Sequence, residues 1–77
     1  MRAEHDKQAD AIYIYLTDKP YAYGNGLDDT RRIDYSSDGS PRGIELLCVS
    51  QGVDLKDLPF RSEIEKLLSK KKIKIYA

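Results

Sequence analysis

The sequence has one cysteine, no tryptophan, one phenylalanine and no excess of charge of either sign among its 77 residues. One cysteine excludes an internal disulfide, so the chain lacks the covalent support of small secreted domains, and we expect a reducing cytoplasm as its location. The thirteen Lys and Arg balance the thirteen Asp and Glu, so the total charge provides no attraction to nucleic acid or to an anionic membrane. No apolar run is long enough for a signal peptide or a membrane helix. A chain of this length forms one domain with a thin core.

Alternation of apolar and polar residues predicts β-strands in the first fifty residues. Ile12, Ile14 and Leu16 recur at every second position in a segment rich in β-branched and aromatic types, which is typical of a half-buried strand. Three other segments have turn residues at their ends and can pair with it. The predicted strands are residues 2–5, 11–17, 31–35 and 43–49, and they form an antiparallel meander within residues 1–50.

The spacing of apolar residues changes from every second position to a helical period near the end of the chain. Phe60, Ile64, Leu67 and Leu68 have the i, i+4, i+7, i+8 spacing of an amphipathic helix, which we predict over residues 57–70. Residues 73–76 then alternate again and predict a short last strand.

Together these elements predict an α+β domain covering residues 1–77. The expected sheet has the last strand beside the first, followed by the other strands in chain order, with every pair antiparallel. The helix packs on one face of this sheet. The predicted core contains Ile12, Ile14, Leu16, Ile33, Ile44 and Leu46 from the sheet and Phe60, Ile64, Leu67 and Leu68 from the helix.

Residues 34–45, DYSSDGSPRGIE, imitate a calcium-binding loop, with Asp34, Asp38-Gly39 and Glu45 at matching places. Two residues depart from that pattern, because Pro41 lacks the backbone N–H required at the eighth place and Arg42 brings a cation to the ninth. The flanking segments have strand and not helix periodicity. We therefore predict no metal site and no other cofactor.

Asp38-Gly39 between two strands is instead typical of a two-residue hairpin turn. With that turn, Ile33 faces Ile44 on one side of the sheet, and Arg32 faces Glu45 on the other as a cross-strand ion pair.

The remaining candidates for chemistry are predicted to be structural. His5, with Asp6 close by, lacks a nucleophile or a second ligand, and Cys48 alternates with Ile44 and Leu46 as a small buried side chain. Gly24-Asn25-Gly26 lacks the third glycine and the helix of a phosphate-binding loop. We therefore assign no catalytic residue and expect a protein that is not an enzyme.

Six tyrosines are the most informative feature of the composition. Tyr13 and Tyr15 lie opposite the Ile12 and Ile14 face, and Leu47 and Val49 are predicted to join them on a sheet face that one short helix cannot cover. Two interpretations remain open at this point. The face is a homo-oligomer or partner interface, where tyrosine is enriched, or it is a partly exposed side of the sheet.

A basic segment formed by Lys70, Lys71, Lys72 and Lys74, with Tyr76 beside it, supports a different class of function, a weak nucleic-acid binder. The alternative for these lysines is a solvated helix end. Binding that falls steeply with salt would distinguish nucleic-acid binding from protein association.

Residues 6–16, DKQADAIYIYL, and 33–50, IDYSSDGSPRGIELLCVS, resemble a small prokaryotic family known as domain of unknown function 2283. Its most specific elements here are Ala-Asp-Ala-Ile-Tyr and Asp-Gly…Gly-Ile-Glu. Ser36 and Cys48 stand where the family commonly has acidic residues, which weakens a metal site further. The resemblance implies a compact β-rich domain with a helix and no agreed reaction, and by analogy a partner-binding or antitoxin-like role. Our first functional hypothesis is thus a protein-interaction or self-associating module that uses the tyrosine face or an unpaired sheet edge.

Overall fold

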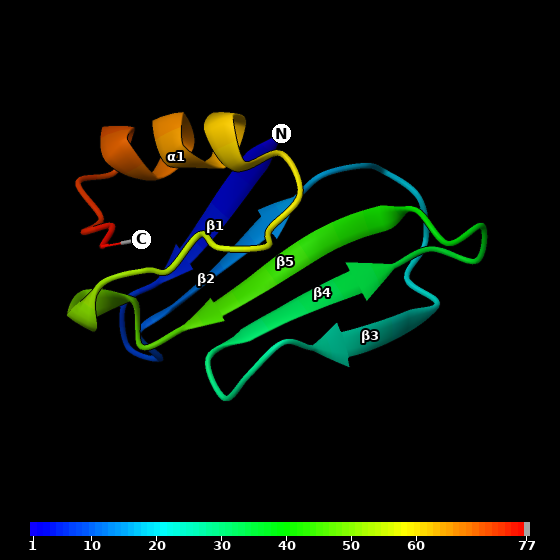
Figure 1. Ribbon diagram of the computed structural model, residues 1–77, viewed down its shortest axis with the longest axis horizontal. Coiled ribbons are helices and arrows are strands. Elements are labelled where there is room, and N and C mark those ends of the chain that lie inside the picture. The colour runs from blue at the N-terminus through cyan, green and yellow to red at the C-terminus, as the bar shows by residue number, and fades with distance from the viewer. Residues whose placement is uncertain (77) are drawn as a thin grey trace.

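The computed structural model describes residues 1–76 as one five-stranded antiparallel sheet with a helix, which confirms the α+β class (Figure 1). The strands lie in the order β1-β2-β5-β4-β3. The elements along the chain are β1 (Arg2–Asp6), β2 (Ala11–Tyr15), β3 (Tyr23–Gly26), β4 (Arg31–Tyr35), β5 (Pro41–Leu47), the 3-10 helix η1 (Val49–Gln51) and α1 (Arg61–Lys70).

The order of the strands differs from the predicted meander. β5 lies between β2 and β4, which we expected to be neighbours, and β3 is an edge strand that the sequence did not indicate. Strands β3, β4 and β5 form consecutive hairpins, and β2 lies beside β5, which is Greek-key connectivity. The physical reason is that β5 carries Ile44 and Leu46 on one face, and a central strand buries both of them between neighbours on two sides.

A row of isoleucines across the three central strands is the centre of the core. Ile14 lies opposite Ile44 on β5, and Ile44 lies opposite Ile33 on β4. Ile64 and Leu68, one turn apart on α1, are fully buried in the same cluster. The side of the sheet that carries the isoleucines is therefore the side that the helix covers, as the alternation predicted.

The segment between β5 and α1 also belongs to the core, which was not predicted from the sequence. It crosses the same side of the sheet as the helix (Figure 1). Val49, Val53, Leu55 and Leu58 are each at most 7% exposed. Arg31 anchors the segment, because its guanidinium donates to the carbonyl oxygens of residues 54 and 56 at 3.1 and 2.6 Å. These buried residues supplement a core that a ten-residue helix alone covers only in part.

The helix begins at Arg61, four residues after the predicted start. Phe60 is the N-cap residue in a left-handed conformation (φ 56°), and its side chain is 53% exposed. The prediction that Phe60 belongs to the core is therefore wrong. The helix ends as predicted at Lys70, and Lys72 (φ 59°) and Ile73 then close a Schellman motif through bonds to the carbonyls of residues 69 and 68.

The predicted last strand does not join the sheet. Ile75 instead forms an isolated parallel bridge with Val53, supported by bonds from the Val53 N–H to Lys74 and from the Tyr76 N–H to Val53. The ring of Tyr76 occupies the space that a side chain at Gly52 would fill, because a Cβ there would lie 2.4 Å from the ring. The chain end that follows the Schellman turn therefore lies against the segment between β5 and α1.

Within residues 1–76 we find no helix whose length and hydropathy would let it cross a bilayer.

Candidate functional site

The candidate site is the side of the sheet that faces away from α1, which we call the open face. Because side chains alternate along a strand, burial of Ile12, Ile14 and Ile44 on one side places their neighbours on the other. The open face comprises Arg2 and Glu4 of β1, Tyr13 and Tyr15 of β2, Arg32 and Asp34 of β4, and Gly43, Glu45 and Leu47 of β5.

A buried carboxylate lies at the centre of the open face. Asp34 is 3% exposed, and its two oxygens accept hydrogen bonds from the Tyr13 hydroxyl (2.8 Å) and the Arg32 Nε (2.9 Å). Two glycines make room for this arrangement. A Cβ at Gly43 would lie 2.2 Å from the Tyr13 hydroxyl oxygen, and a Cβ at Gly24 would lie 2.8 Å from the Asp34 Oδ1. The tyrosine ring therefore lies directly over the backbone of β5.

A β-bulge brings a second arginine to this cluster. Tyr35 pairs with Pro41 and Asp34 pairs with Gly43, so Arg42 is an extra residue on β5. Its Nη1 donates to the Tyr13 hydroxyl at 2.9 Å, and its Nε donates to the Lys19 carbonyl at 3.0 Å. The Tyr13 hydroxyl thus accepts from Arg42 and donates to Asp34, and both of its hydrogen-bonding functions are used.

Aromatic and guanidinium groups are stacked beside this cluster. The rings of Tyr13 and Tyr15 meet edge to face, with centroids 4.8 Å apart. The Arg2 guanidinium carbon lies 4.0 Å from the Tyr15 ring centroid, and that of Arg42 lies 5.7 Å from the same centroid. Cation–π contacts at these distances hold both tyrosines and both arginines in place.

The surroundings of the cluster raise the pKa of two of its groups, Tyr13 and Arg32. Burial, followed by the hydrogen bond to Asp34, raises the pKa of the Tyr13 phenol, and Arg42 offsets part of that rise. Burial alone would lower the pKa of Arg32, but its bond to Asp34 raises it above the usual value. A phenol with a raised pKa keeps its proton near neutral pH, so little phenolate is present to act as a base or a nucleophile.

The structure brings together three of the four residues predicted to form the tyrosine face. Tyr13 and Tyr15 are half-buried neighbours, and Leu47, 38% exposed, lies opposite Ala11 at the end of β5. Val49 does not belong with them, because it is 2% exposed within the core on the helix side. β5 ends at Leu47, and the left-handed conformation of Cys48 (φ 54°) interrupts the alternation on which that assignment depended.

Cys48 itself is exposed, so the prediction that it is buried is wrong for the same reason.

The segment that imitates a calcium loop is a hairpin between β4 and β5, as predicted, but its turn is different. Gly39 (φ 83°) donates to the Ser36 carbonyl and Ser36 donates to the Ser40 carbonyl, each at 3.0 Å, so the loop has three residues and not two. The longer loop and the bulge at Arg42 each shift the register by one residue, and the shifts cancel.

The predicted strand register is therefore confirmed. Ile33 lies opposite Ile44, and Arg32 lies opposite Glu45 with an N–O distance of 3.8 Å between the charged groups.

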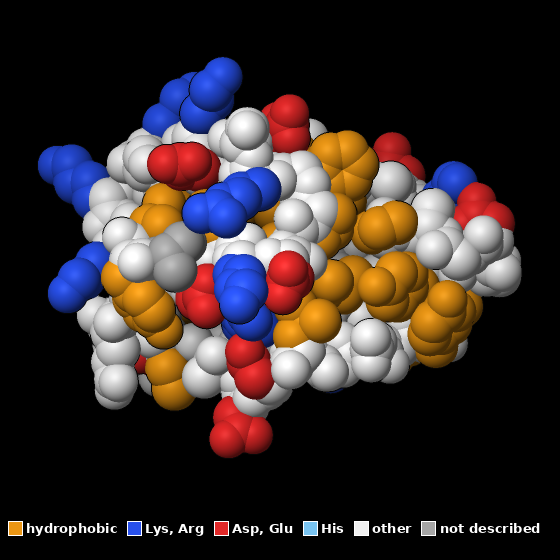
Figure 2. All heavy atoms as spheres, viewed as in Figure 1, with side chains coloured by type: hydrophobic (Ala, Val, Ile, Leu, Met, Phe, Trp, Pro, Cys, Tyr) orange, Lys and Arg blue, Asp and Glu red, His pale blue; other side chains and the backbone are white. Residues whose placement is uncertain are grey.

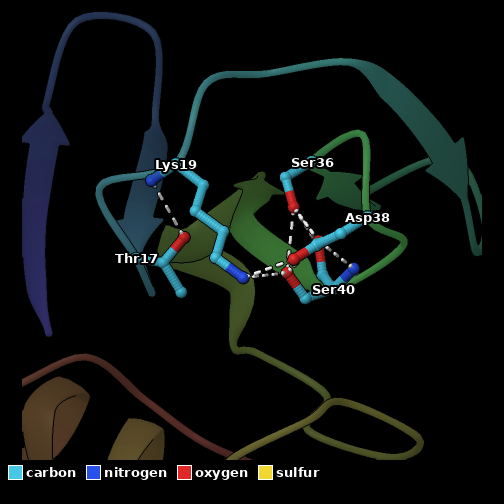
Figure 3. A network of polar contacts seen from close by, with 5 residues as sticks. All are labelled: Thr17, Lys19, Ser36, Asp38 and Ser40. Atoms are coloured by element: carbon cyan, nitrogen blue, oxygen red, sulfur yellow. Dashed lines mark hydrogen bonds and ion pairs between the residues drawn. The ribbon is translucent and has the colours of Figure 1, made fainter.

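The carboxylate of Asp38 is engaged within the hairpin (Figure 3). Its Oδ2 binds the Lys19 ammonium at 2.5 Å, and its Oδ1 accepts from the Ser36 and Ser40 hydroxyls at 2.5 and 2.7 Å. Lys19, then Ser36 and Ser40, lower the pKa of Asp38 well below its usual range. Asp34 and Glu45 bind arginine instead, and no group of three or more His, Cys, Asp or Glu that could hold a metal ion occurs in residues 1–76.

None of the other predicted residues hydrogen-bonds to Tyr13 or Asp34. His5 is half-buried on β1 on the side opposite Glu4, and Asp6 accepts from the Ala9 N–H (3.1 Å) within the β1–β2 turn. Lys70, Lys71, Lys72 and Lys74 are all exposed at the end of α1, and Tyr76 is 64% exposed near them.

Asp34 and Arg42 were not predicted as partners of Tyr13. Both were assigned only to the imitation of a calcium loop, whereas their separation from Tyr13 is 21 and 29 residues. Gly43 was the available signal, because glycine inside a strand often marks a close approach of another group.

Comparison with protein families identifies the first two thirds of the chain. Residues 2–50, which contain all five strands and the open face, match the model described as "Protein of unknown function (DUF2283)". The chain belongs to the DUF2283 family. The match confirms the resemblance seen in the sequence, and the DUF2283 segment ends within η1, before α1. Searches of curated proteins and of solved structures found no match.

Proposed function

We propose that this DUF2283 domain is a non-enzymatic protein-interaction module whose open face binds a partner protein. The observation that carries the proposal is the ordered group of Tyr13, Tyr15, Arg2 and Arg42 on a face that the helix does not cover. Tyrosine and arginine are enriched at protein interfaces, where they combine a large contact area with hydrogen-bonding ends.

Contacts within the domain restrict the arginine side chains of the open face before any partner binds, which favours binding. Arg42 donates to Tyr13 and to the Lys19 carbonyl, and Arg2, whose side chain is 66% exposed, contacts the Tyr15 ring and Glu4 at 2.9 Å. Side chains that are already restricted lose less conformational entropy when a partner immobilises them. Such a surface needs fewer new contacts to reach a given affinity.

The chemistry of the partner follows from a shallow groove next to Tyr13. Glu4, Asp6 and Glu45 line it together with Lys7 and the Tyr13 ring, so carboxylates outnumber ammonium groups there. A basic side chain from the partner would meet three carboxylates and an aromatic surface there. By analogy with such families, the domain would have an antitoxin-like role and its partner would be a toxin protein. We place the module in the cytoplasm, where the single exposed thiol of Cys48 stays reduced.

The test is affinity capture from the native cell with two variants. Tyr15→Ser removes an aromatic side chain of the open face whose hydroxyl is not part of the Asp34 network, and Tyr76→Ser removes an exposed tyrosine at the other side of the molecule. A partner retained by the parent and by Tyr76→Ser, and lost with Tyr15→Ser, supports the open face. Equal retention by both variants, with thermal melts showing both folded, would refute it.

A second candidate function is a weak nucleic-acid binder. Its support is the exposure of Lys70, Lys71, Lys72 and Lys74 next to the exposed ring of Tyr76. Replacing Lys70, Lys71 and Lys72 together by Glu should abolish binding to single-stranded RNA or DNA, and parental binding should fall steeply as salt rises. Absence of parental binding at low salt would exclude this function.

A further inference from the structure

We propose that β3 pairs in an antiparallel manner with β3 of a second copy of this chain, joining two five-stranded sheets into one continuous sheet. The β3 edge is separate from the open face and from the partner proposed for it. The proposal depends on the contrast between the two edge strands, β1 and β3.

The β1 edge carries the charges by which proteins prevent association of exposed strands. Three of its five residues, Arg2, Glu4 and Asp6, are charged and exposed. β3 reads Tyr-Gly-Asn-Gly, contains no charge and no proline, and is exposed at all four residues. An uncharged edge without proline is the kind that accepts another strand.

The extended backbone at this edge is longer than the strand itself. Bonds from the Ala22 N–H to Tyr35 and from the Leu27 N–H to Arg31, both 2.8 Å, continue the contact with β4 on either side. Ala22 and Tyr23 both lie opposite Tyr35, so Ala22 is an extra residue, as in a β-bulge. N–H and C=O groups alternate in direction along an antiparallel strand, so from Tyr23 to Leu27 the bond from Leu27 implies that Gly24 and Gly26 direct theirs toward solvent. These groups form the unpaired row to which a further strand can bond.

Aromatic side chains at this edge are only half covered. Tyr23 stacks on Tyr35 with centroids 5.2 Å apart, yet it remains 50% exposed, and Tyr21 is 54% exposed. Figure 2 shows hydrophobic side chains gathered over the β3 side of the sheet, away from the helix. A strand added beside β3 would cover this aromatic surface.

A second copy of the chain fits this edge better than a charged peptide would. The chain has no net charge, so two copies meet without long-range repulsion, and the uncharged strand brings no like charges together. With Gly24 opposite Gly24 of the second copy, each Tyr23 lies opposite Asn25 of the other copy on the same face. The pairing is self-complementary, as a twofold dimer requires.

The test compares two variants that each add one positive charge. Gly26→Lys places the charge on the β3 edge, where a Cβ at Gly26 has only the Asp28 carbonyl at 4.0 Å, and Gln8→Lys places it in the exposed β1–β2 turn at the other edge. Sedimentation equilibrium over a wide range of concentrations measures association, and circular dichroism shows that each variant is folded.

We expect the parent and Gln8→Lys to dimerise and Gly26→Lys to associate at least about tenfold more weakly, since charge at an edge opposes strand pairing. In the parent, hydrogen exchange at the amides of Gly24 and Gly26 should slow as concentration rises. A parent that stays monomeric, or a Gly26→Lys variant that dimerises as the parent does, would overturn the proposal. A dimer that is lost in Tyr15→Ser but kept in Gly26→Lys would also overturn the proposal, because association would then use the open face.

Discussion

Removal of the Tyr13 hydroxyl should destabilise the domain although the side chain is only half-buried. In Tyr13→Phe the Asp34 Oδ2 loses its donor at 2.8 Å while the residue stays 3% exposed, and Arg42 loses its acceptor at 2.9 Å. Hydrogen bonds to charged groups contribute about 1.5–3 kcal/mol, and we expect a loss of about 2 kcal/mol because Arg32 still binds the other oxygen. For a domain of this size that corresponds to a fall in Tm of roughly 8–16 °C.

The assay is urea unfolding followed by far-UV circular dichroism, with Tyr15→Phe as the matched control. The Tyr15 hydroxyl is outside the Asp34 network, so its removal should change the free energy of unfolding by less than about 0.5 kcal/mol. A double-mutant cycle combines Tyr13→Phe with Asp34→Ala. The loss in free energy of unfolding caused by Tyr13→Phe should be smaller by about 1 kcal/mol or more when Asp34 has already been replaced. Equal stability of Tyr13→Phe and the parent would refute the assignment of Asp34 as a buried acceptor that depends on Tyr13.

The pH dependence of stability provides an independent check of the same contact. Because the pKa of Tyr13 is raised in the folded state, the folded protein holds the phenol proton more tightly than the unfolded chain does. Its contribution is fully present below the ordinary pKa of 10.0 and is lost as pH rises through the folded value. The parent should therefore lose stability more steeply above pH 10 than Tyr13→Phe, and identical slopes would contradict this.

Three substitutions and the addition of calcium test other parts of the structure. Leu55→Ala should lower the free energy of unfolding by about 2–5 kcal/mol, because Leu55 is fully buried, and a loss below about 1 kcal/mol in urea unfolding would show that its segment lies outside the core. Phe60→Gly should keep the free energy of unfolding within about 1 kcal/mol of the parent, since it relieves a left-handed φ at an exposed residue, whereas a core phenylalanine would cost about 3–5 kcal/mol. Asp38→Asn should destabilise the hairpin near neutral pH. The lowered pKa of Asp38 means that the carboxylate stabilises above its ordinary value of 3.8 and ceases to do so as pH falls through the folded value, so the difference in Tm from the parent should shrink in acid. Calcium should leave the Tm and the NMR signals of Asp38 unchanged, because Lys19 and two serines already occupy its oxygens, and selective shifts at Asp38 would refute that account.

Local patterns were sufficient for most elements of the fold. The alternation around Ile12 and Ile14 predicted both the strand and its buried side, and the spacing of Ile64 and Leu68 predicted the helix face. Both results depend only on the direction of side chains within one element, which the backbone period fixes.

The candidate site could be predicted only in part for a related reason. Tyr13 and Tyr15 were placed together because they belong to one strand, but Val49 was placed with them by extending an alternation that ends at Cys48. A left-handed residue reverses the direction of the following chain, and Cys48 gives no sign of that conformation in the sequence. Where such a residue occurs, periodicity no longer predicts which side is buried.

The sequence by itself thus determined the α+β class, the register of the β4–β5 hairpin at Ile33 and Ile44, and membership of the DUF2283 family. Only the tertiary structure decided that β5 lies at the centre of the sheet, and that this position brings Arg42 and Asp34 to the hydroxyl of Tyr13. The reason is that strand neighbours are selected by the sum of many contacts between distant residues. The entropy of closing a loop depends only weakly on its length, so spacing along the chain does not indicate which strands will pair.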